Sequence, residues 1–196
     1  MEREFKWKAT AGDFEELVQY LGLNEIEPVE MFAEYYDTPD RRLRQRKVAL
    51  RMRRENHEQL CCLKLRDAAS DGLHVHEEYE CMAATLEEGL GVLPGQGAPL
   101  DLCHALRTAD LSVVCQTKFH RRRAVWLDPL FTAELSFDQG VLSCAGRELP
   151  VGEIECEQKS GEDVAFEEAC QLLARRFSLK PEARSKLSRA LDLERA

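Results

Sequence analysis

The 196-residue chain lacks any apolar run that approaches the roughly 18 residues of a membrane-spanning helix. Its first ten residues, MEREFKWKAT, carry charge from the start and contain no apolar core of a signal peptide. An excess of positive charge is also missing, because 27 Lys and Arg stand against 36 Asp and Glu, for a net charge of −9. These absences predict a cytoplasmic globular protein with neither a membrane nor a nucleic acid as partner.

The chain also lacks the C-x-x-C pairs and the Cys/His spacing that are typical of a zinc site. It does have eight cysteines: Cys61, Cys62, Cys81, Cys103, Cys115, Cys144, Cys156 and Cys170. Because no export signal is visible, a disulfide framework is not expected. We therefore predict that the thiols are reduced and mostly buried as small apolar groups.

Positive charge is concentrated in one part of the chain. Residues 41–54 contain eight Lys and Arg and no acid, so this window carries +8 and the remainder −17. A protein with this distribution can be acidic on its outside and still bind an anion.

Alternating and periodic segments predict about eight strands with helices on their flanks. Strands are expected at residues 2–10, 31–36, 48–54, 60–66, 73–82, 111–127, 131–138 and 151–159, with a small glycine-containing hairpin between the last two. Helices are expected at 13–22, 85–93, 100–109 and about 163–177, the last after a capping box at 160–163, and in the final 15 residues. No long linker interrupts this order, so we expect one domain, residues 1–196, built on a closed antiparallel barrel.

Charged residues recur two apart along most of these strands, which places them on one face of each strand. The sets are Glu2, Glu4, Lys6 and Lys8; Arg51 and Arg53; Lys64 and Arg66; His74, His76, Glu78 and Glu80; Glu134 and Asp138; and Glu153, Glu155 and Glu157. Solvated outer faces are one interpretation. Like charges on neighbouring positions repel, however, and acidic faces alternate with basic ones, which favours a shared polar interior. Such an interior suits a polyanion together with Mg²⁺ or Mn²⁺, because carboxylates bind hard cations and Arg forks match phosphate oxygens.

Glu2-x-Glu4-x-Lys6 resembles the ExExK signature of the CYTH domain, the triphosphate tunnel metalloenzyme superfamily. That signature alone is weak, since short charged alternations are common. The family's order continues through Tyr36-Asp37-Thr38-Pro39-Asp40, Leu43, residues 49–53, Leu63-Lys64, Glu78-x-Glu80, Arg121, Asp138, residues 153–157 and Ser185-Lys186. A match in this order over nearly the whole chain is specific.

The resemblance implies an α+β fold, mainly antiparallel β, in which an eight-stranded closed barrel forms a tunnel with flanking helices. It implies that triphosphate oxygens are bound by Lys6, Arg51, Arg53, Lys64, Arg121 and Lys186. It implies Mg²⁺ or Mn²⁺ as cofactor, with Glu2, Glu4, Glu153 and Glu155 as metal ligands and Glu78, Glu80 and Asp138 assisting. By the same resemblance, the catalytic residues would be Glu2, Glu4, Lys6, Glu153 and Glu155.

The chain departs from the family pattern at two positions. His76 stands where relatives often have an arginine, and Phe119 stands where relatives often have a lysine. The second departure leaves open which of Lys118, Arg121 and Arg123 faces the tunnel.

The resemblance implies metal-dependent hydrolysis of a small triphosphate to pyrophosphate and phosphate. Inorganic triphosphate is the preferred substrate, ahead of thiamine triphosphate and nucleoside triphosphates. Two alternatives stay open: an adenylate cyclase of the same family, although no motif supplies an adenine pocket, and a non-catalytic polyphosphate- or nucleotide-binding module. A homodimer is compatible with the sequence.

Overall fold

The computed structural model describes residues 1–70 and 72–194, without the side chains of residues 66–68, so the predicted place of the Arg66 side chain lies outside it. In chain order the elements are β1 (Glu2–Lys8), α1 (Ala11–Leu21), β2 (Glu27–Asp37), α2 (Arg42–Gln45), β3 (Ala49–Glu55), β4 (Glu58–Ser70), β5 (Leu73–Met82), α3 (Leu86–Val92), a 3₁₀ turn (Leu93–Gln96), α4 (Leu100–Arg107), β6 (Ser112–Leu127), β7 (Phe131–Cys144), β8 (Arg147–Gly161), α5 (Asp163–Arg176), β9 (Lys180–Pro181) and α6 (Lys186–Asp192).

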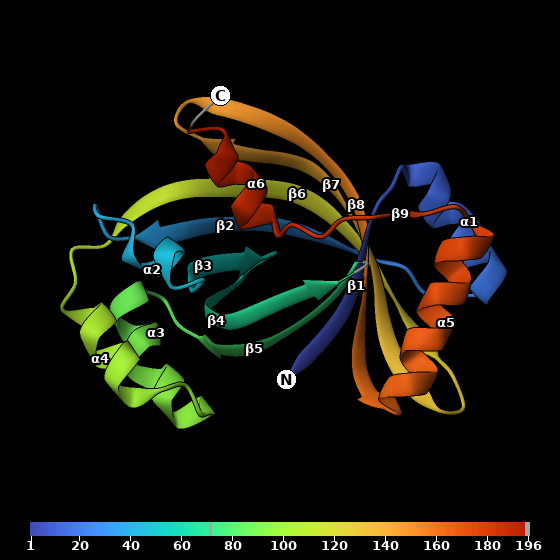
Figure 1. Cartoon of the computed structure of the whole chain (residues 1–196), viewed down its shortest axis with the longest axis horizontal. Coiled ribbons are helices and arrows are strands. Elements are labelled where there is room, and N and C mark those ends of the chain that lie inside the picture. Colours follow the sequence, from blue (N-terminus) through green and yellow to red (C-terminus); the bar gives the residue numbers. More distant parts are fainter. Residues whose placement is uncertain (71, 195–196) are drawn as a thin grey trace.

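Across the described residues, eight antiparallel strands form a closed barrel in the order β5-β4-β3-β2-β6-β7-β8-β1 (Figure 1). The barrel closes where the first half of β1 pairs with β5, with Glu2 opposite His76 and Glu4 opposite His74. Beyond that stretch, the short strand β9 takes over as the partner of β1. The predicted closed barrel with flanking helices is therefore confirmed.

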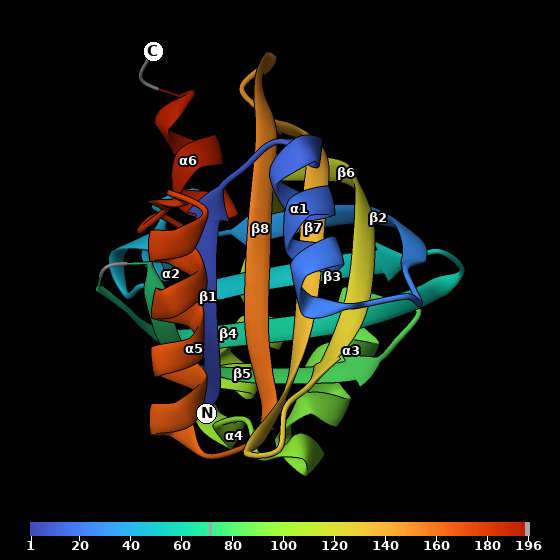
Figure 2. The same ribbon diagram turned by 90° about the vertical axis from the view of Figure 1, so that its right-hand side faces the viewer.

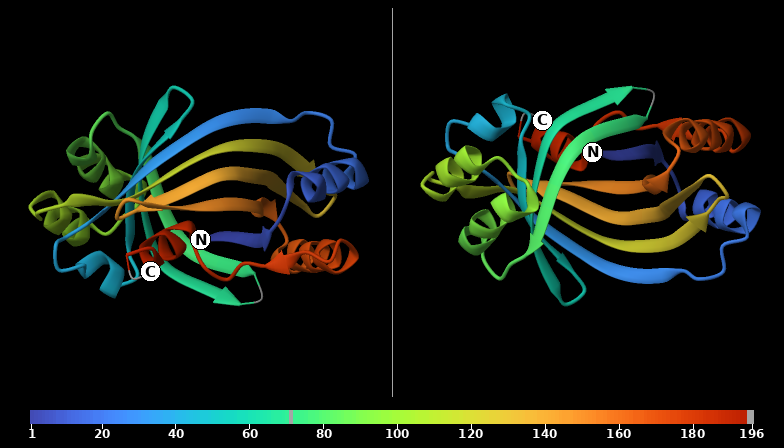
Figure 3. Two further views of the ribbon diagram at one scale, coloured as in Figure 1. Left: turned by 90° about the horizontal axis from the view of Figure 1, so that it is seen from above. Right: turned by 90° about the horizontal axis from the view of Figure 1, so that it is seen from below.

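One wall of the barrel includes the long, curved strands β6, β7 and β8, which the views from above and below show along their length (Figure 3). The sequence analysis predicted shorter strands here. In the structure β7 and β8 are one long hairpin that turns at Ala145 and Gly146, both with positive φ. β8 also continues through Ser160 and Gly161, so α5 begins at Asp163. Its N-cap residue, Glu162, makes no side-chain capping hydrogen bond, and the predicted capping box is wrong.

The two largest apolar clusters lie on the outside of the barrel, between its strands and the helices. α1 and α5 cover one end, where Trp7 of β1 and Phe166 of α5 are fully buried in a shared cluster (Figure 2). α3 and α4 cover the other end, over β3, β4 and β5. Where α3 packs on β4, a Cβ on Gly89 would lie 2.2 Å from the Cβ of Cys61. The helix can come this close to the strand only because residue 89 has no side chain.

Local signals explain the helix that follows β1. The Thr10 hydroxyl accepts a hydrogen bond from the Asp13 backbone, and the Asp13 carboxylate accepts one from the Thr10 backbone at 2.7 Å. Gly22 ends the helix with φ of 67°, a conformation that glycine adopts without strain. In the described part of the chain, every helix is too short or too polar to cross a membrane.

All eight cysteines lie within the described residues, and each is buried with a free thiol. Their predicted burial is confirmed. Because most apolar residues occupy the outer faces of the strands, the charged residues two apart along each strand are left on the inner faces, where Cys62 joins them.

Candidate active site

A cavity of about 600 Å³ runs into the barrel and is lined by residues of the strands and of α6. Among the described residues, its wall carries eleven Lys and Arg against eight Glu, in a chain whose net charge is −9. The cationic members are Lys6, Arg44, Lys47, Arg51, Arg53, Lys64, Arg121, Arg123, Lys159, Arg184 and Lys186. The inside of the barrel is thus net positive while the whole chain is acidic, as a site for a polyanion requires.

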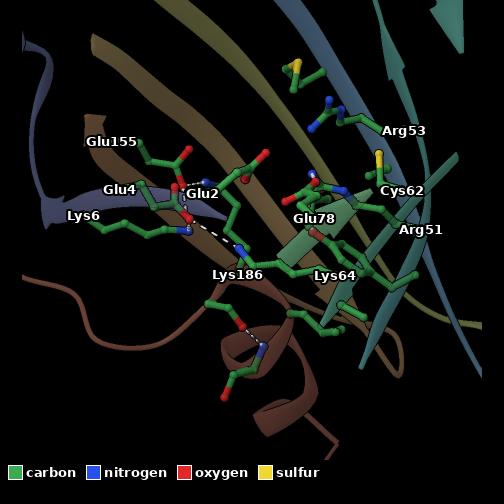
Figure 4. A pocket seen from close by; sticks show the side chains of 18 of the residues that line it. Glu2, Glu4, Lys6, Arg51, Arg53, Cys62, Lys64, Glu78, Glu155 and Lys186 are labelled. Atoms are coloured by element: carbon green, nitrogen blue, oxygen red, sulfur yellow. Dashed lines mark hydrogen bonds and ion pairs between the residues drawn. The ribbon is translucent and has the colours of Figure 1, made fainter. Parts of the chain in front are cut away.

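Lys6 and Glu155 lie side by side on β1 and β8, which place them in register. The Lys6 Nζ is 3.0 Å from Glu4 Oε1 and 3.1 Å from Glu155 Oε1 (Figure 4). Burial disfavours the charged form of Glu155, but Lys186, Lys6 and Arg121 outweigh it and hold its pKa well below the usual value. For the same reason the pKa of Lys6 is well above its usual value, so the pair is ionised throughout the physiological range.

A second group, here called the inner cluster, lies deeper and is made of Arg121, Asp138, Glu153, Glu155, Lys186 and Arg189. Its hub is Lys186 of α6, whose Nζ is 2.7 Å from Asp138, 2.9 Å from Glu155 and in contact with Glu153. Arg121 forks onto the Asp138 carboxylate at 2.7 and 2.8 Å. Arg189 forms an ion pair with Glu153, so each carboxylate of the cluster has its own cation.

This arrangement bears on two predicted metal ligands. Asp138 and Glu153 are fully buried and do not line the cavity. Together with Glu155 they are close enough to hold a metal ion, but an ion there would have to displace the Lys186 ammonium. Their role as metal ligands stays a prediction, and the structure gives them cations of the protein as partners.

The facing wall, from β3, β4 and β5, brings together the other predicted phosphate ligands (Figure 4). Arg51 donates to Glu78 at 2.9 Å, and Arg53 donates to Glu80 at 2.8 Å. Burial disfavours the Glu78 carboxylate, but Arg51, His76 and Lys64 hold its pKa well below the usual value. Lys64 reaches across to Glu4 Oε1 at 3.3 Å and so connects the two walls.

At the third group, here called the acidic end, Glu4 has Lys6 and Lys64 as partners, but the carboxylates beside it are less fully paired. It consists of Glu2, Glu4 and Glu157, and Glu4 lies directly opposite Glu157 in the β1–β8 pairing. Among the described side chains, one cation lies within ion-pair distance of Glu157. It is Lys159, whose Nζ is 2.8 Å from Glu157 Oε1. Burial, with the charges of Glu2 and Glu4, raises the pKa of Glu157 to about 7 although Lys159 opposes the shift. An additional cation would be stabilised here.

The structure settles which basic residues of β6 face inward. Arg121 and Arg123 line the cavity together with Phe119, whereas Lys118 is exposed on the outer side. His76, at the first departure from the family pattern, is buried with its Nε2 2.8 Å from Glu2 Oε2.

Some site residues were missed by the sequence analysis. Arg189 lies three residues after Lys186, so helical spacing could have placed both on one face of α6. Lys159 lies two residues after Glu157 and extends the inward face of β8. Tyr35, whose hydroxyl accepts from Arg51 at 3.3 Å, carried no charge to mark it.

Comparison with known proteins agrees with this geometry. Over 134 residues the chain is 33% identical to an inorganic triphosphatase of Haemophilus influenzae, a match that covers 65% of this chain and 35% of that protein. The chain therefore spans about a third of the curated relative that it matches.

Solved structures share the fold. A candidate adenylyl cyclase from Hippeastrum, described as having a dominant triphosphatase activity, superposes with a TM-score of 0.68 at 20% identity, over 96% of this chain and 94% of that one. A Pyrococcus horikoshii protein superposes with a TM-score of 0.65 at 20% identity over the full length of both chains. The model of the CYTH domain matches residues 1–191, and the chain therefore belongs to the CYTH domain family.

Proposed function

We propose that this protein hydrolyses inorganic triphosphate to pyrophosphate and phosphate with the help of a divalent metal ion. The observation that carries the proposal is the enclosed cavity in which cations from both walls converge. Lys6, Arg121 and Lys186 lie on one side, and Arg51, Arg53 and Lys64 lie on the other. The triphosphatase relative and the family membership support the same reaction class.

The cations of the cavity would bind the phosphate oxygens and stabilise the charge that develops on them. Arg51 and Arg53 are suited to this role because a guanidinium offers two parallel donors to a phosphate group. Each already holds a carboxylate, so the site keeps its geometry without substrate. The ligand would then add to a wall whose cations are in position beforehand.

The residues of the acidic end fit a hard divalent cation, since Glu2, Glu4 and Glu157 offer only oxygen donors and repel one another. We propose that Glu2 and Glu4 hold Mg²⁺ or Mn²⁺ there, with the Glu4 oxygen that does not contact Lys6 and Lys64 facing the ion. When bound, that ion would neutralise charge on the phosphates.

Glu157 is the carboxylate of β8 that is free to act on water. Glu155 and Glu153 are held by Lys186, whereas Glu157 has one exposed lysine beside it. Without a metal ion the pKa of Glu157 is about 7, and a cation held by Glu2 and Glu4 would lower it, so that Glu157 would be ionised at neutral pH, as a group that orients a water molecule and accepts its proton must be.

A thiol nucleophile does not fit this site. Cys62 lines the cavity, but burial raises its pKa despite the opposing charges of Arg51 and Arg53. Its neighbour Cys61 is buried against α3, and burial raises its pKa to about 12. In the proposed reaction, water therefore attacks the terminal phosphorus directly, and pyrophosphate leaves.

The test is a panel of inorganic triphosphate, thiamine triphosphate and ATP, assayed for phosphate and pyrophosphate with Mg²⁺, Mn²⁺ and Ca²⁺. We expect the fastest phosphate release from inorganic triphosphate. Cyclic AMP with pyrophosphate from ATP would instead identify a cyclase. Tight triphosphate binding without phosphate release under any metal would identify a binding module.

Matched variants test the assignment of faces. Lys6→Ala and Arg53→Ala should lower kcat/KM by about 100-fold or more, because each removes a cation from the cavity. Arg3→Ala is the control on the opposite face of β1, where Arg3 pairs with Glu167 and Asp163 of α5. Equal losses in the three variants would refute the assignment.

A further inference from the structure

His76 forms a three-residue group with Glu2 and Glu78 on the β1–β5 side of the cavity. The imidazole Nε2 is 2.8 Å from Glu2 Oε2 and 3.4 Å from Glu78 Oε2. One ligand atom from each residue lies within 4.8 Å of the others. Two carboxylates thus converge on a single ring nitrogen, which can share at most one proton with them.

We propose that Glu2, His76 and Glu78 form a binding site for a transition-metal ion of the Zn²⁺ type. An ion at this point would replace the shared proton and would be held by one nitrogen and two oxygens. Imidazole is a ligand that Zn²⁺, Co²⁺ and Ni²⁺ accept well, whereas Mg²⁺ favours an all-oxygen shell. The site therefore selects a different class of metal from the all-oxygen acidic end.

The second ring nitrogen supports this assignment. His76 is 1% exposed, and its Nδ1 is buried without a hydrogen-bond partner. That nitrogen points toward Glu4 and lies 3.8 Å from its Oε1. A metal-bound histidine usually donates its other N–H to a carboxylate, and a small closure of this distance would complete that contact.

Access and an open coordination position come from the two carboxylates. Glu2 and Glu78 both line the cavity, and the side chain of Glu2 is 36% exposed. The other oxygen of Glu78 accepts from Arg51 at 2.9 Å, which fixes the orientation of this carboxylate. Three protein ligands leave a fourth position toward the cavity, as in zinc sites that bind water or an anion.

The site shares Glu2 with the cation site of the proposed function, but it goes beyond that function because it needs no triphosphate to bind metal. A neighbouring group, Cys62 with Glu78 and Glu80, is the competing assignment, since it shares Glu78 and offers a thiol. The two groups share only Glu78, and one has a nitrogen donor where the other has a sulfur donor, a difference that Co²⁺ absorption reports directly.

The test adds Co²⁺ or Zn²⁺ to the chelator-treated full chain in excess Mg²⁺, with calorimetry for affinity and visible absorption for Co²⁺. We expect one site per chain that Mg²⁺ does not displace, with d–d absorption and no thiolate charge-transfer band. His76→Gln and Glu2→Gln should each weaken binding by about 100-fold or more, beyond the loss expected for an outer-shell group. Glu2→Gln is the safer variant for folding, because its side chain is partly exposed.

Cys62→Ser is the matched control and should leave Co²⁺ affinity unchanged. A charge-transfer band that Cys62→Ser abolishes would overturn the proposal in favour of the thiol group. Binding that survives both His76→Gln and Glu2→Gln, or no binding in excess Mg²⁺, would overturn it as well. Mg²⁺-dependent phosphate release is measured separately, on the native chain without Co²⁺ or Zn²⁺, and tests the proposed function alone.

Discussion

The two ends of the acidic run on β8 differ in how many cations surround them. At the inner end, Glu153 is fully buried and contacts both Lys186 and Arg189. At the outer end, four residues later, Glu157 lies opposite Glu4 and has Lys159 as its ion-pair partner. The same residue type on the same face of one strand is therefore saturated at one end and short of positive charge at the other.

This difference distinguishes carboxylates that stabilise the fold from carboxylates that would take part in the reaction. A buried carboxylate that already holds cations of the protein contributes to the fold, because removing one partner leaves the rest uncompensated. A carboxylate beside like charges is where a metal ion or a proton gains most by binding. The inner cluster would thus fix α6 against the barrel, while the acidic end would serve the reaction.

The largest expected effect is on the stability of the inner cluster. Glu153→Gln leaves Lys186 and Arg189 short of a buried carboxylate, so we expect a loss of about 3 kcal/mol, or about 10 °C in Tm. Thermal unfolding followed by circular dichroism measures it, with Glu157→Gln as the control variant. An unchanged Tm together with lost binding of Mg²⁺ or Mn²⁺ would make Glu153 a metal ligand and reverse the comparison.

The next effect concerns activity at the outer end. Glu157→Gln keeps the size of the side chain but cannot accept a proton, so kcat should fall by about 100-fold while KM for triphosphate changes little. Steady-state phosphate release measures both constants. A rise in KM with kcat unchanged would instead mean that Glu157 acts in binding alone.

The sequence could predict the faces of the strands but not the difference along β8. Alternation alone places Glu153, Glu155 and Glu157 on one side, because side chains of a strand alternate between faces. Which of them receives Lys186 depends on where α6 packs against the barrel, and no local pattern encodes that position. Likewise His76 is visible in the sequence, but its contact with Glu2 arises only from the pairing that closes the barrel.

The strand ends were missed for a related reason. The sequence predicts a separate small hairpin between residues 138 and 151, whereas in the structure residues 139–144 and 147–150 extend β7 and β8, because each strand supplies the hydrogen-bond partners of the other. The sequence could not show whether Arg121 or Lys118 faces the cavity, since each lies next to aromatic or basic residues. The β6–β7 register, which sets Arg121 opposite Asp138, decides it.

A smaller effect should appear in the pH dependence of stability without metal. The pKa of Glu157 is raised from 4.5 to about 7 in the folded state, so folding takes up a proton between these values. The stability contributed by this group is present at low pH and is lost as the pH rises through about 7.

Glutamine does not titrate, so the Glu157→Gln variant does not lose this stability as the pH rises. The free energy of unfolding of the variant, minus that of the native chain, should therefore increase between about pH 5 and pH 8. Urea unfolding of both proteins across this range, in buffer containing a chelator, measures the difference. Parallel curves would show that Glu157 titrates normally and that the acidic end is not short of positive charge.

The smallest effect should come from Lys159, which is the cation that partly offsets the acidic end. Its side chain is 44% exposed, and an exposed ion pair contributes at most about 1 kcal/mol. Lys159→Met should therefore raise the pKa of Glu157 by less than about one unit and move the acidic limb of kcat/KM to higher pH by the same amount. Lys8→Met is the matched control, because Lys8 is also exposed and pairs with Glu182 instead. A shift in both variants would reflect the overall charge of the chain, whereas a shift in Lys159→Met alone assigns the limb to Glu157.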